Sequence, residues 1–549
     1  MEFKGVITAE ETFFYPDTTC KALPETLRLA SAQNGLRGVQ LLLQSGEENV
    51  TISLKTDAFV VELFELRAIP VEYNTGNGVA QGGAMVLLAE EKPDYATRKA
   101  PFTVYDCLVP QQEGVIPVNE GVAACYFCLR PKQNLEAGTY QVLLQAAGAQ
   151  DTYCCQLEVT VYPVMIPADT FAVTNWFSLA AISRFHGVEQ GSAAFLTVLE
   201  RYIHAMRRAH QTMFFIQLDE TCVTSRAPYE FDFEYLTPVV TLFFAQGMQQ
   251  MEIGTLLSRG WLADHRPDMR TDIFRCAMAQ DVPFESAEGY AISVRFVQAL
   301  AAYLTRHGWQ DKVVFHIHDE PDIHVKDENT MAHRRRQYYL AANILRKYLP
   351  SIRIIEAVDS AQFYGGVDIW VPGTAGYEAK KEQFDALIAL GETVWAYVCC
   401  GPEGQWLNRF LDFALLKGRL LFWGCAKNRL GGFLHWGFNQ FVETMDPFVG
   451  TSCPNTTGIG TSFPCGDAFI VYPGKDGPWL SMRLEASRRG AEDAALLQLL
   501  REQNPAKHDA LVTRVFRTNT DYNDNPAEFE TVWEELLQAL CEKPTGGTD

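Results

Sequence analysis

Between residues 170 and 440, short apolar segments alternate with stretches whose apolar residues recur at helical spacing. The β-branched and aromatic runs favour buried strands, and the stretches between them favour helices near 192–209, 235–246, 291–306, 332–348, 377–390 and 405–418. The eight expected strands are 171–176, 212–217, 249–254, 313–317, 352–357, 367–371, 393–398 and 432–436. Eight strands alternating with helices over about 270 residues predict a (β/α)8 barrel of the TIM type.

The two ends of the chain have a different character. Residues 1–165 contain many short alternating segments separated by Gly, Asn and Glu turns, which predicts an N-terminal β-sandwich. No acids, histidines or nucleophiles cluster there, so structural support is favoured over ligand contact. The last part of the chain is helical. We therefore expect a multidomain β plus α/β protein with a sandwich (1–165), a barrel (170–500) and a C-terminal helical extension packed on the barrel (501–549).

Composition and charge exclude several kinds of partner. The 549-residue chain has a net charge of −21, whereas nucleic-acid binding needs a concentrated basic surface. No apolar run approaches membrane-spanning length, and no secretory leader is visible. The 14 cysteines lack regular spacing, which indicates reduced thiols. We expect a cytoplasmic protein, or an exported one if a leader precedes this sequence, with no nucleic-acid partner, no membrane partner and no cofactor. The sequence does not decide between a monomer and a homo-oligomer.

One expected strand ends in two adjacent carboxylates. The run Val313-Val314-Phe315-His316-Ile317 is apolar enough to be buried, and His318-Asp319-Glu320-Pro321 follows it directly. Pro321 cannot donate to a strand ladder, so the strand ends before it. In a barrel, the carboxyl ends of the strands carry the functional residues. Asp319 and Glu320 are therefore the candidate catalytic pair, although two solvated acids at a turn would give the same local pattern.

The other expected strand ends carry indole rings, amides and acids. Aromatic faces and hydrogen-bonding side chains together suit sugars, whose C–H faces are apolar and whose hydroxyl groups need partners. We therefore expect a carbohydrate substrate, although any single aromatic residue could instead belong to the core. The candidate substrate-binding residues are Asn175, Trp176, Glu252, Trp370, Trp395, Tyr397, His435, Trp436 and Asn439.

Glycoside hydrolysis normally needs two carboxyl groups that flank the anomeric carbon. The sixth and seventh expected strands end without an acid, in Pro372-Gly373 and Cys399-Cys400-Gly401-Pro402. The second carboxylate is then the neighbour of the first, and adjacent residues cannot reach C1 from opposite faces. They can serve a sugar that carries its own nucleophile, a 2-acetamido group. Glu320 would act as acid and base, with its pKa raised by its charged neighbour, and Asp319 would orient the acetamide N–H.

Two other functions fit the same stretch. His316, His318 and Glu320 alternate onto one face of the strand, and a His-x-His pattern on a barrel strand can bind zinc, which would give a metal-dependent barrel hydrolase. Apart from His435, no further ligands stand clearly at other strand ends, so no metal site is predicted. The other alternative is a non-catalytic carbohydrate-binding protein, which the intact acid pair disfavours.

Several motifs together resemble one protein family. In chain order they are His318-Asp319-Glu320-Pro321, Asn408-Arg409, Gly432-Phe433-Leu434-His435-Trp436-Gly437, Tyr472-Pro473-Gly474 and Arg483-Leu484-Glu485. Their order and spacing resemble the domain of unknown function 4091, which includes family 123 of the glycoside hydrolases. The resemblance implies a β-sandwich, a catalytic (β/α)8 barrel and exo-acting β-N-acetylgalactosaminidase activity on a terminal β-linked N-acetylhexosamine.

The resemblance also implies roles for individual residues. By position in the motif, Glu320 matches the acid/base of the family and Asp319 matches the carboxylate that orients the acetamide. Two aromatic roles rest only on strand-end position: Trp436 is the expected sugar platform, and Tyr397 is the expected hydrogen-bond donor to the acetamide oxygen.

Overall fold

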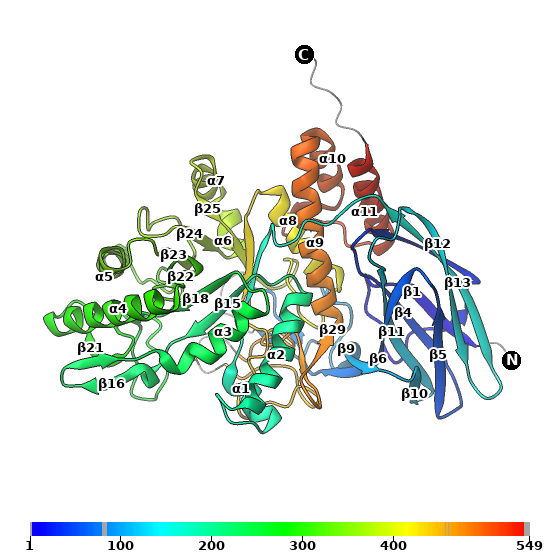
Figure 1. Ribbon diagram of the computed structural model, residues 1–549, viewed down its shortest axis with the longest axis horizontal. Helices are drawn as coiled ribbons and strands as arrows, with labels where there is room; N and C mark the ends of the chain where they lie inside the picture. Colours follow the sequence, from blue (N-terminus) through cyan, green and yellow to red (C-terminus); the bar gives the residue numbers. More distant parts are fainter. Residues whose placement is uncertain (1–2, 79–84, 456, 459–460, 543–549) are drawn as a thin grey trace, which may run out of the picture.

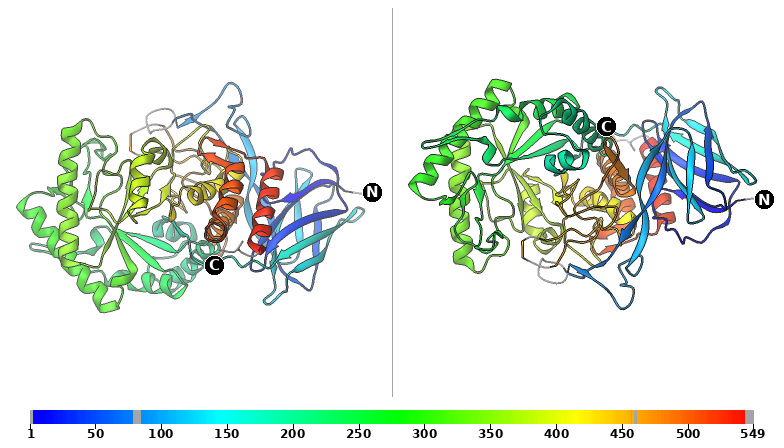
Figure 2. Two further views of the ribbon diagram at one scale, coloured as in Figure 1. Left: turned by 90° about the horizontal axis from the view of Figure 1, so that it is seen from above. Right: turned by 90° about the horizontal axis from the view of Figure 1, so that it is seen from below.

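The computed structural model describes residues 3–78, 85–455, 457–458 and 461–542. Two large bodies lie side by side: N-terminal β-sheets, in blue and cyan, and a barrel covered by helices, mainly in green and yellow (Figure 1). The C-terminal helices, in orange and red, lie between these bodies, and both views in Figure 2 show the same arrangement. Among the described residues, no helix combines the length and the apolar character that crossing a membrane requires.

The N-terminal region is rich in β-structure, as predicted. One layer has the strand order β2-β1-β4-β11-β6-β9, and the other has the order β10-β5-β12-β13-β3. β10 pairs with both β5 and β11, which joins the two layers into one hydrogen-bonded network. The bounds are β1 (Lys4–Ala9), β2 (Lys21–Ala22), β3 (Thr26–Ala32), β4 (Arg37–Gln44), β5 (Asn49–Lys55), β6 (Phe59–Val71), β9 (Phe102–Gln111), β10 (Val115–Asn119), β11 (Val122–Pro131), β12 (Gly138–Ala147) and β13 (Thr152–Tyr162).

The layer that contains β4 is buried on both faces. Leu41 belongs to the apolar cluster between the two layers, together with Val142. Leu42 points to the other face and belongs to a cluster that includes Leu411, from the barrel side. A strand covered on both sides has no polar face, which explains why β4 has an almost continuous run of buried residues.

Nine parallel segments form a sheet that nearly closes on itself, in the order β25-β24-β23-β22-β18-β15-β14-β27-β26. β25 and β26 are the two halves of the predicted seventh strand, separated by Trp395. Because β25 pairs with β24 and β26 pairs with β27, this divided strand links the two ends of the sheet, as in the predicted barrel. The bounds are β14 (Ala172–Asn175), β15 (Met213–Gln217), β18 (Gln250–Gly254), β22 (Val313–His316), β23 (Arg353–Val358), β24 (Ile369–Pro372), β25 (Thr393–Val394), β26 (Ala396–Tyr397) and β27 (Gly432–His435).

Helices cover the outside of this sheet. They are α1 (Leu179–His186), α2 (Ala193–Arg208), α3 (Thr237–Ala245), α4 (Ala287–His307), α5 (Glu328–Tyr348), α6 (Thr374–Ala379), α7 (Lys381–Ala389) and α8 (Leu416–Lys427). The described segment 359–368, between β23 and β24, contains no helix. The helix predicted over 405–418 is wrong, because α8 begins only at Leu416. The preceding stretch is irregular where the Asp412 carboxylate accepts hydrogen bonds from the Thr75 backbone (2.8 Å) and hydroxyl (2.7 Å).

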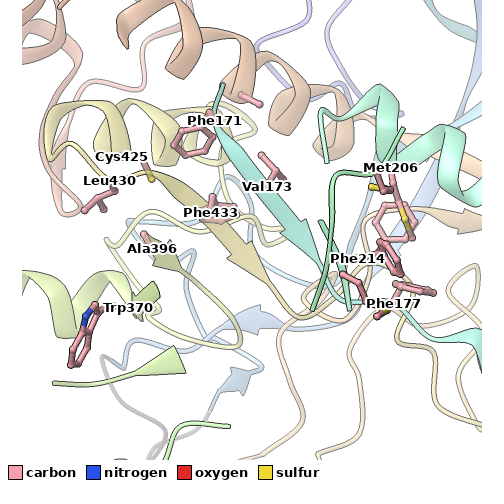
Figure 3. Packing of buried hydrophobic residues seen from close by; sticks show 14 of the residues in the cluster. Phe171, Val173, Phe177, Met206, Phe214, Trp370, Ala396, Cys425, Leu430 and Phe433 are labelled. Atoms are coloured by element: carbon pink, nitrogen blue, oxygen red, sulfur yellow. The ribbon is translucent and has the colours of Figure 1, made fainter. Parts of the chain in front are cut away.

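Successive side chains along the barrel strands point to opposite faces of the sheet, which gives one apolar core inside the barrel and another beneath the helices. Val173 and Phe433 point outward and pack beneath the helices, as Figure 3 shows. Ile369 and Val371 lie inside the barrel. Trp370, between them in sequence, lies in the outer core (Figure 3), which is the expected consequence of a two-residue repeat.

The helix α9 (Met482–Gln503) links the two bodies. The hydroxyl of its N-cap residue Ser481 accepts a hydrogen bond from the Leu484 N–H at 3.0 Å. β29 (Pro478–Ser481), directly before it, pairs with β9 and so extends the N-terminal layer. The predicted boundary at residue 500 falls inside α9, and the division into three domains remains a prediction. The C-terminal part continues with α10 (Pro505–Val515) and α11 (Pro526–Cys541).

Short strands lie in the connecting loops. They are β7 (Asn74–Thr75), β8 (Val86–Leu87), β16 (Val223–Arg226), β17 (Tyr229–Phe231), β19 (Leu257–Ser258), β20 (Arg275–Cys276), β21 (Ala279–Pro283), β28 (Tyr472–Pro473), β30 (Phe516–Thr518) and β31 (Asp521–Tyr522). Those between β18 and α4 matter for function, because β19 is followed by an arginine of the candidate site.

Candidate active site

The acid pair lies just beyond the carboxyl end of β22, in a sharp turn. Glu320 has a φ of 51°, in the left-handed region that is unfavourable for a residue with a side chain. The Glu320 carbonyl accepts a hydrogen bond from Arg259 Nη2 at 2.8 Å, which helps to hold the turn. The Asp319 side chain is 50% exposed. The turn therefore presents one acid to solvent at the end of the barrel where active sites of this fold lie.

The surroundings of Glu320 favour its protonated form. Burial is the largest cause and the Asp319 carboxylate is the second, and together they raise the pKa of Glu320 to about 7. The Tyr397 hydroxyl, at the end of β26, donates a hydrogen bond to Glu320 Oε1 and opposes this shift. A carboxyl group with a pKa near 7 can both give and take a proton near neutral pH.

A buried imidazole, His316, lies on the barrel side of Asp319. Its Nδ1 is 2.9 Å from Glu252 Oε1, and its Nε2 is 3.4 Å from Glu356 Oε1 and 3.8 Å from Asp319 Oδ1. Burial by itself lowers the pKa of His316, but the three carboxylates, Glu356 foremost, raise it to about 10. His316 therefore carries a positive charge that faces Asp319 from below.

The two carboxylates that hold His316 are themselves fixed. Glu252 accepts a hydrogen bond from Trp176 Nε1 at 3.0 Å, and Glu356 accepts one from the Tyr338 hydroxyl at 2.9 Å. Burial raises the pKa of Glu356 to about 8, against the opposing effect of His316. Both carboxylates are fully buried. They orient the imidazole and lie behind the surface that a substrate could touch.

Arg259 supplies a second cation near the acid pair. Burial lowers the pKa of Arg259, and the carboxylates of Asp319 and Glu320 oppose this shift. A guanidinium group stays charged under such a shift because its ordinary pKa is so high. Arg259 acts on both acids, whereas His316 Nε2 lies 3.8 Å from Asp319 Oδ1 and the Glu320 carboxyl group accepts a hydrogen bond from the phenol of Tyr397. The two neighbouring acids are chemically unequal.

A second polar group lies under Trp436, after β27. His435 Nδ1 accepts hydrogen bonds from Arg409 Nη2 at 2.6 Å and from the Gly437 N–H at 2.9 Å. The remaining ring proton is therefore on Nε2, which lies 3.4 Å from Asp467 Oδ1. Asp467 Oδ2 accepts the indole N–H of Trp436 at 3.1 Å. Burial raises the pKa of Asp467 to about 7. This group fixes the edge of the Trp436 ring and leaves the ring partly exposed.

Only part of the predicted substrate-binding set can touch a ligand. Trp176, Tyr397 and Trp436 are partly exposed near the acid pair or at the neighbouring strand ends. Glu252 and His435 are fully buried and act through the residues that they hold. Asn175 is buried as well, and its Oδ1 accepts a hydrogen bond from Arg409 Nη1 at 2.8 Å.

Three predicted residues lie away from this surface and are corrected here. Trp370 is only 1% exposed and packs in the outer core, because it points away from the barrel interior. Trp395 lies inside the barrel but packs on Gly432, the first residue of β27, at the end opposite to the acids. Asn439 is buried and bonds both the N–H and the carbonyl of Ser178 (2.8 and 3.2 Å), which ties two loops together.

Several residues of the site were missing from the predicted set. Glu356 stands at a strand end and carried the same signal as the residues that were chosen. The sequence allows His316 to be a metal ligand, a core residue or a supporting residue behind the site, and the structure shows it buried behind Asp319. Arg259 and Asp467 lie in excursions after β18 and β27, where no local pattern indicates which way the chain returns. Arg409 belongs to a motif whose role the sequence did not reveal.

The arrangement of the histidines bears on the metal-dependent alternative. The carboxylates of Glu252 and Glu356 face opposite nitrogens of the His316 ring, so they do not converge on one point. The His318 ring packs against Phe274 in a tilted arrangement, with the ring centroids 4.2 Å apart. Within the described ranges, no three His, Cys, Asp or Glu side chains form a group that could hold a metal ion.

Comparisons with known proteins agree with this geometry. The family profile described as "Glycoside hydrolase 123, catalytic domain" matches residues 176–500. A solved structure of a family 123 glycoside hydrolase from Clostridium perfringens, described in terms of glycolipid glycan hydrolysis, is similar over 98% of this chain and 97% of its own, with a TM-score of 0.71 and 14% identity. A family 39 glycoside hydrolase from Bacteroides cellulosilyticus WH2 is similar over 85% of this chain and 82% of its own, at a TM-score of 0.36 and 11% identity. No curated protein sequence matches the chain.

The family profile covers more than half of the chain and includes the acid pair, the Trp436 group and the start of α9. The similarity to the Clostridium perfringens structure shows that the fold is shared over nearly the full length of both chains. The resemblance noted from the sequence motifs is confirmed. The chain belongs to family 123 of the glycoside hydrolases and is a glycosidase with a carbohydrate substrate.

Proposed function

We propose that the protein releases a terminal β-linked N-acetylhexosamine, most specifically N-acetylgalactosamine, by a retaining mechanism in which the 2-acetamido group of the substrate is the nucleophile. The observation that carries the proposal is the inequality of the adjacent acids. Glu320, with a pKa raised to about 7, suits proton transfer. Asp319, half exposed and 3.8 Å from the imidazole of His316, suits the hydrogen-bond acceptor for the acetamide N–H.

In the first step, Glu320 protonates the glycosidic oxygen while the acetamide carbonyl oxygen attacks C1. The bond from C1 to the leaving group breaks, and an oxazolinium ring forms on the sugar. Asp319 accepts the hydrogen bond of the acetamide N–H, which becomes more acidic as positive charge develops. In the second step, Glu320 takes a proton from water, the water oxygen bonds to C1 and the ring opens. Two inversions at C1 give net retention.

A conventional double displacement is disfavoured by the other carboxylates of the barrel. It requires a second carboxyl group about 5–5.5 Å from the acid and able to reach C1. Glu252 and Glu356 are fully buried and are held by His316 and their other partners. Glu403, the first acid after the divided strand, is bonded to the Gly78 N–H at 3.1 Å. The substrate's own acetamide fills the role that these residues cannot.

The partly exposed aromatic residues define where the sugar would lie. Trp436 offers an indole face for the apolar C–H side of the ring, and its N–H is already taken by Asp467. The Tyr397 hydroxyl donates to Glu320 in this structure and would donate instead to the acetamide oxygen once substrate enters. Trp176 covers His316 at a centroid distance of 5.3 Å and would form the floor beside Asp319.

A panel of aryl β-glycosides tests the proposal directly. The galacto and gluco series are each compared with and without the 2-acetamido group. We expect turnover only of the acetamido substrates, with the galacto series preferred, and retention of configuration at C1. Replacing the acetamide by its trifluoro analogue should slow hydrolysis, because it weakens the nucleophilic carbonyl oxygen. Equal rates for substrates that lack the acetamide would refute the substrate-assisted mechanism.

A further inference from the structure

Two adjacent cysteines follow the divided strand of the barrel. Cys399 and Cys400 lie in the bend after β26, and their sulfur atoms are 3.8 Å apart. The bend is held by the Asn408 side-chain amide, which donates to the Cys399 carbonyl at 3.0 Å and to the Pro402 carbonyl at 3.1 Å. The Cys399 N–H also donates to the Gly401 carbonyl, at 3.0 Å. Both thiols therefore point to the same side of a constrained turn.

The chain contains a second adjacent pair, Cys154 and Cys155, with a different geometry. These residues lie within β13, where successive side chains point to opposite faces of the sheet. Cys154 is exposed, whereas Cys155 is buried in the apolar cluster between the two layers. Two thiols on opposite faces cannot bond to one atom. Both pairs are thus adjacent in sequence, but the sulfur atoms lie close together on one side at Cys399 and Cys400.

The converging pair lies close to the proton-transfer group. Cys399 is two residues beyond Tyr397, whose hydroxyl donates to Glu320. Cys399 is partly exposed, whereas Cys400 is 4% exposed. An approaching electrophile would meet Cys399 first, and Cys400 would then react within the same molecule. The bond to Cys400 then forms faster than a bond to an isolated buried thiol, because the reagent is already held beside it.

We propose that Cys399 and Cys400 form a dithiol site for a soft, thiophilic ligand that bonds to two sulfur atoms, such as a trivalent arsenical, and that occupation of this site blocks hydrolysis. With an organoarsenic(III) oxide, two As–S bonds form, the As–O bonds break, and the two thiol protons leave with the oxygen as water. No oxidant or reductant is consumed. The bound group would lie two residues beyond Tyr397 and would disturb its hydrogen bond to Glu320.

The test uses phenylarsine oxide and the full-length protein. After native labelling and removal of excess reagent, peptide mass mapping should place one phenylarsenic group on the peptide that carries Cys399 and Cys400. The adduct should resist a monothiol such as 2-mercaptoethanol and be removed by 2,3-dimercaptopropanol, because only a dithiol replaces both bonds. Hydrolysis of the aryl 2-acetamido glycoside should be lost on labelling and restored by the dithiol.

Matched variants decide between a dithiol site and general thiol reactivity. Cys399→Ser and, separately, Cys400→Ser should each lose the monothiol-resistant adduct and the inhibition. Cys154→Ser should keep both, since that pair does not converge. A resistant adduct that persists in Cys399→Ser and Cys400→Ser, or that maps to Cys154, would overturn the proposal, as would the absence of any adduct on the wild type.

Mass mapping does not depend on which glycoside is hydrolysed, so this result is separate from the test of the proposed function. An adduct at the predicted peptide with unchanged hydrolysis would refute the inhibitory part of the proposal. Failure of the aryl-glycoside panel with a correctly placed adduct would refute the proposed function and leave the dithiol site established.

Discussion

Two buried groups of charged residues in this chain have opposite character. The first lies where α9 meets the N-terminal layer and α11, and each of its carboxylates contacts at least one guanidinium group. Its members, here called the arginine cluster, are Glu10, Glu11, Arg37, Arg419, Glu485, Arg488, Arg489, Glu492, Asp493 and Glu530. The second lies at the end of the barrel, and its members, here called the mouth cluster, are Glu252, Arg259, His316, Asp319, Glu320 and Glu356.

The pKa values of Glu485 and Glu530 in the arginine cluster and of Glu320 in the mouth cluster are shifted in opposite directions. Burial opposes ionisation in both, but Arg208 and Arg488 lower the pKa of Glu485 to about 2, and Arg37 helps to lower that of Glu530 to about 2. Glu11 is an exception, since burial raises its pKa to about 8. In the mouth cluster the pKa of Glu320 is raised to about 7. In the arginine cluster, guanidinium contact keeps Glu485 and Glu530 ionised. In the mouth cluster, burial and a neighbouring like charge raise the pKa of Glu320, and the hydrogen bond from a phenol offsets only part of this rise. The first arrangement joins parts of the fold, and the second can move a proton.

Removing the acid should have the largest effect on rate. Glu320→Gln keeps the shape of the side chain but cannot transfer a proton, so kcat/KM for glycosides with poor leaving groups should fall by about 10²–10⁴-fold. Activated aryl glycosides should be affected less, because their leaving groups need little protonation. The same variant removes a buried ionisable group and should not lower the melting temperature at pH 8. A wild-type rate with a poor leaving group would show that Glu320 is not the acid.

Breaking the arginine cluster should affect stability and leave the chemistry intact. Arg488 is 2% exposed and bonds Glu485 at 2.9 Å and Glu492 at 2.8 Å. Arg488→Met leaves these carboxylates buried without that partner, and should cost about 3–5 kcal/mol of the free energy of unfolding. Denaturant titration measures the loss, and kcat should stay at the wild-type value while the protein is folded.

The surface pair Arg28–Glu158 provides the control for this variant. Its arginine side chain is 87% exposed, so Arg28→Met should change the free energy of unfolding by no more than about 1 kcal/mol. If Arg488→Met is as mild as Arg28→Met, the arginine cluster does not hold the two bodies together.

The stabilising effect of Glu485 is present above its ordinary pKa and should be lost only as pH falls from about 4.5 toward about 2.

The next effect in size concerns Asp319, the exposed member of the acid pair. Asp319→Asn removes the carboxylate that we propose accepts the acetamide N–H, and losing one oriented electrostatic partner commonly costs about 2.7–4 kcal/mol of transition-state stabilisation. We expect the loss in kcat on acetamido substrates, measured by steady-state kinetics. The rate ratio between acetamido substrates and their trifluoro analogues should also change, because assistance by the acetamide is weakened. An unchanged ratio together with a full loss of rate would assign Asp319 a different role.

The acid pair was predictable from sequence because its signal is local. An apolar run followed by two acids and Pro321 fixes the end of a strand without reference to the rest of the chain. The parallel order of the barrel strands followed from the same kind of local pattern. The choice of Trp370 failed for a physical reason: β24 is covered on both sides, so apolar residues on both faces conceal which of them points inward.

The cations of the mouth cluster could not be predicted in the same way. Arg259 reaches the site from the excursion between β18 and α4, and its position depends on how that excursion folds back over β22. The charge on His316 depends on three carboxylates from different strands that are brought together only in the closed sheet. The sequence indicated that two acids stand at this strand end but not why their surroundings differ.

The smallest predicted effect is a shift in pH dependence, and it tests the phenol of the mouth cluster. In the proposed mechanism Glu320 must be protonated for the first step, so kcat/KM should fall as pH rises through about 7. The hydrogen bond from Tyr397 stabilises the carboxylate form and so lowers the pKa of Glu320. Tyr397→Phe removes that bond, and the alkaline fall should therefore move to higher pH, by on the order of one unit. Tyr162→Phe is the matched control, because the Tyr162 hydroxyl donates to Glu534 at 2.7 Å, where β13 meets α11. Tyr162→Phe should leave the pH profile unchanged. A shift to lower pH in Tyr397→Phe would mean that the phenol favours the protonated form of Glu320. The contrast between the two clusters would then no longer rest on guanidinium contact alone.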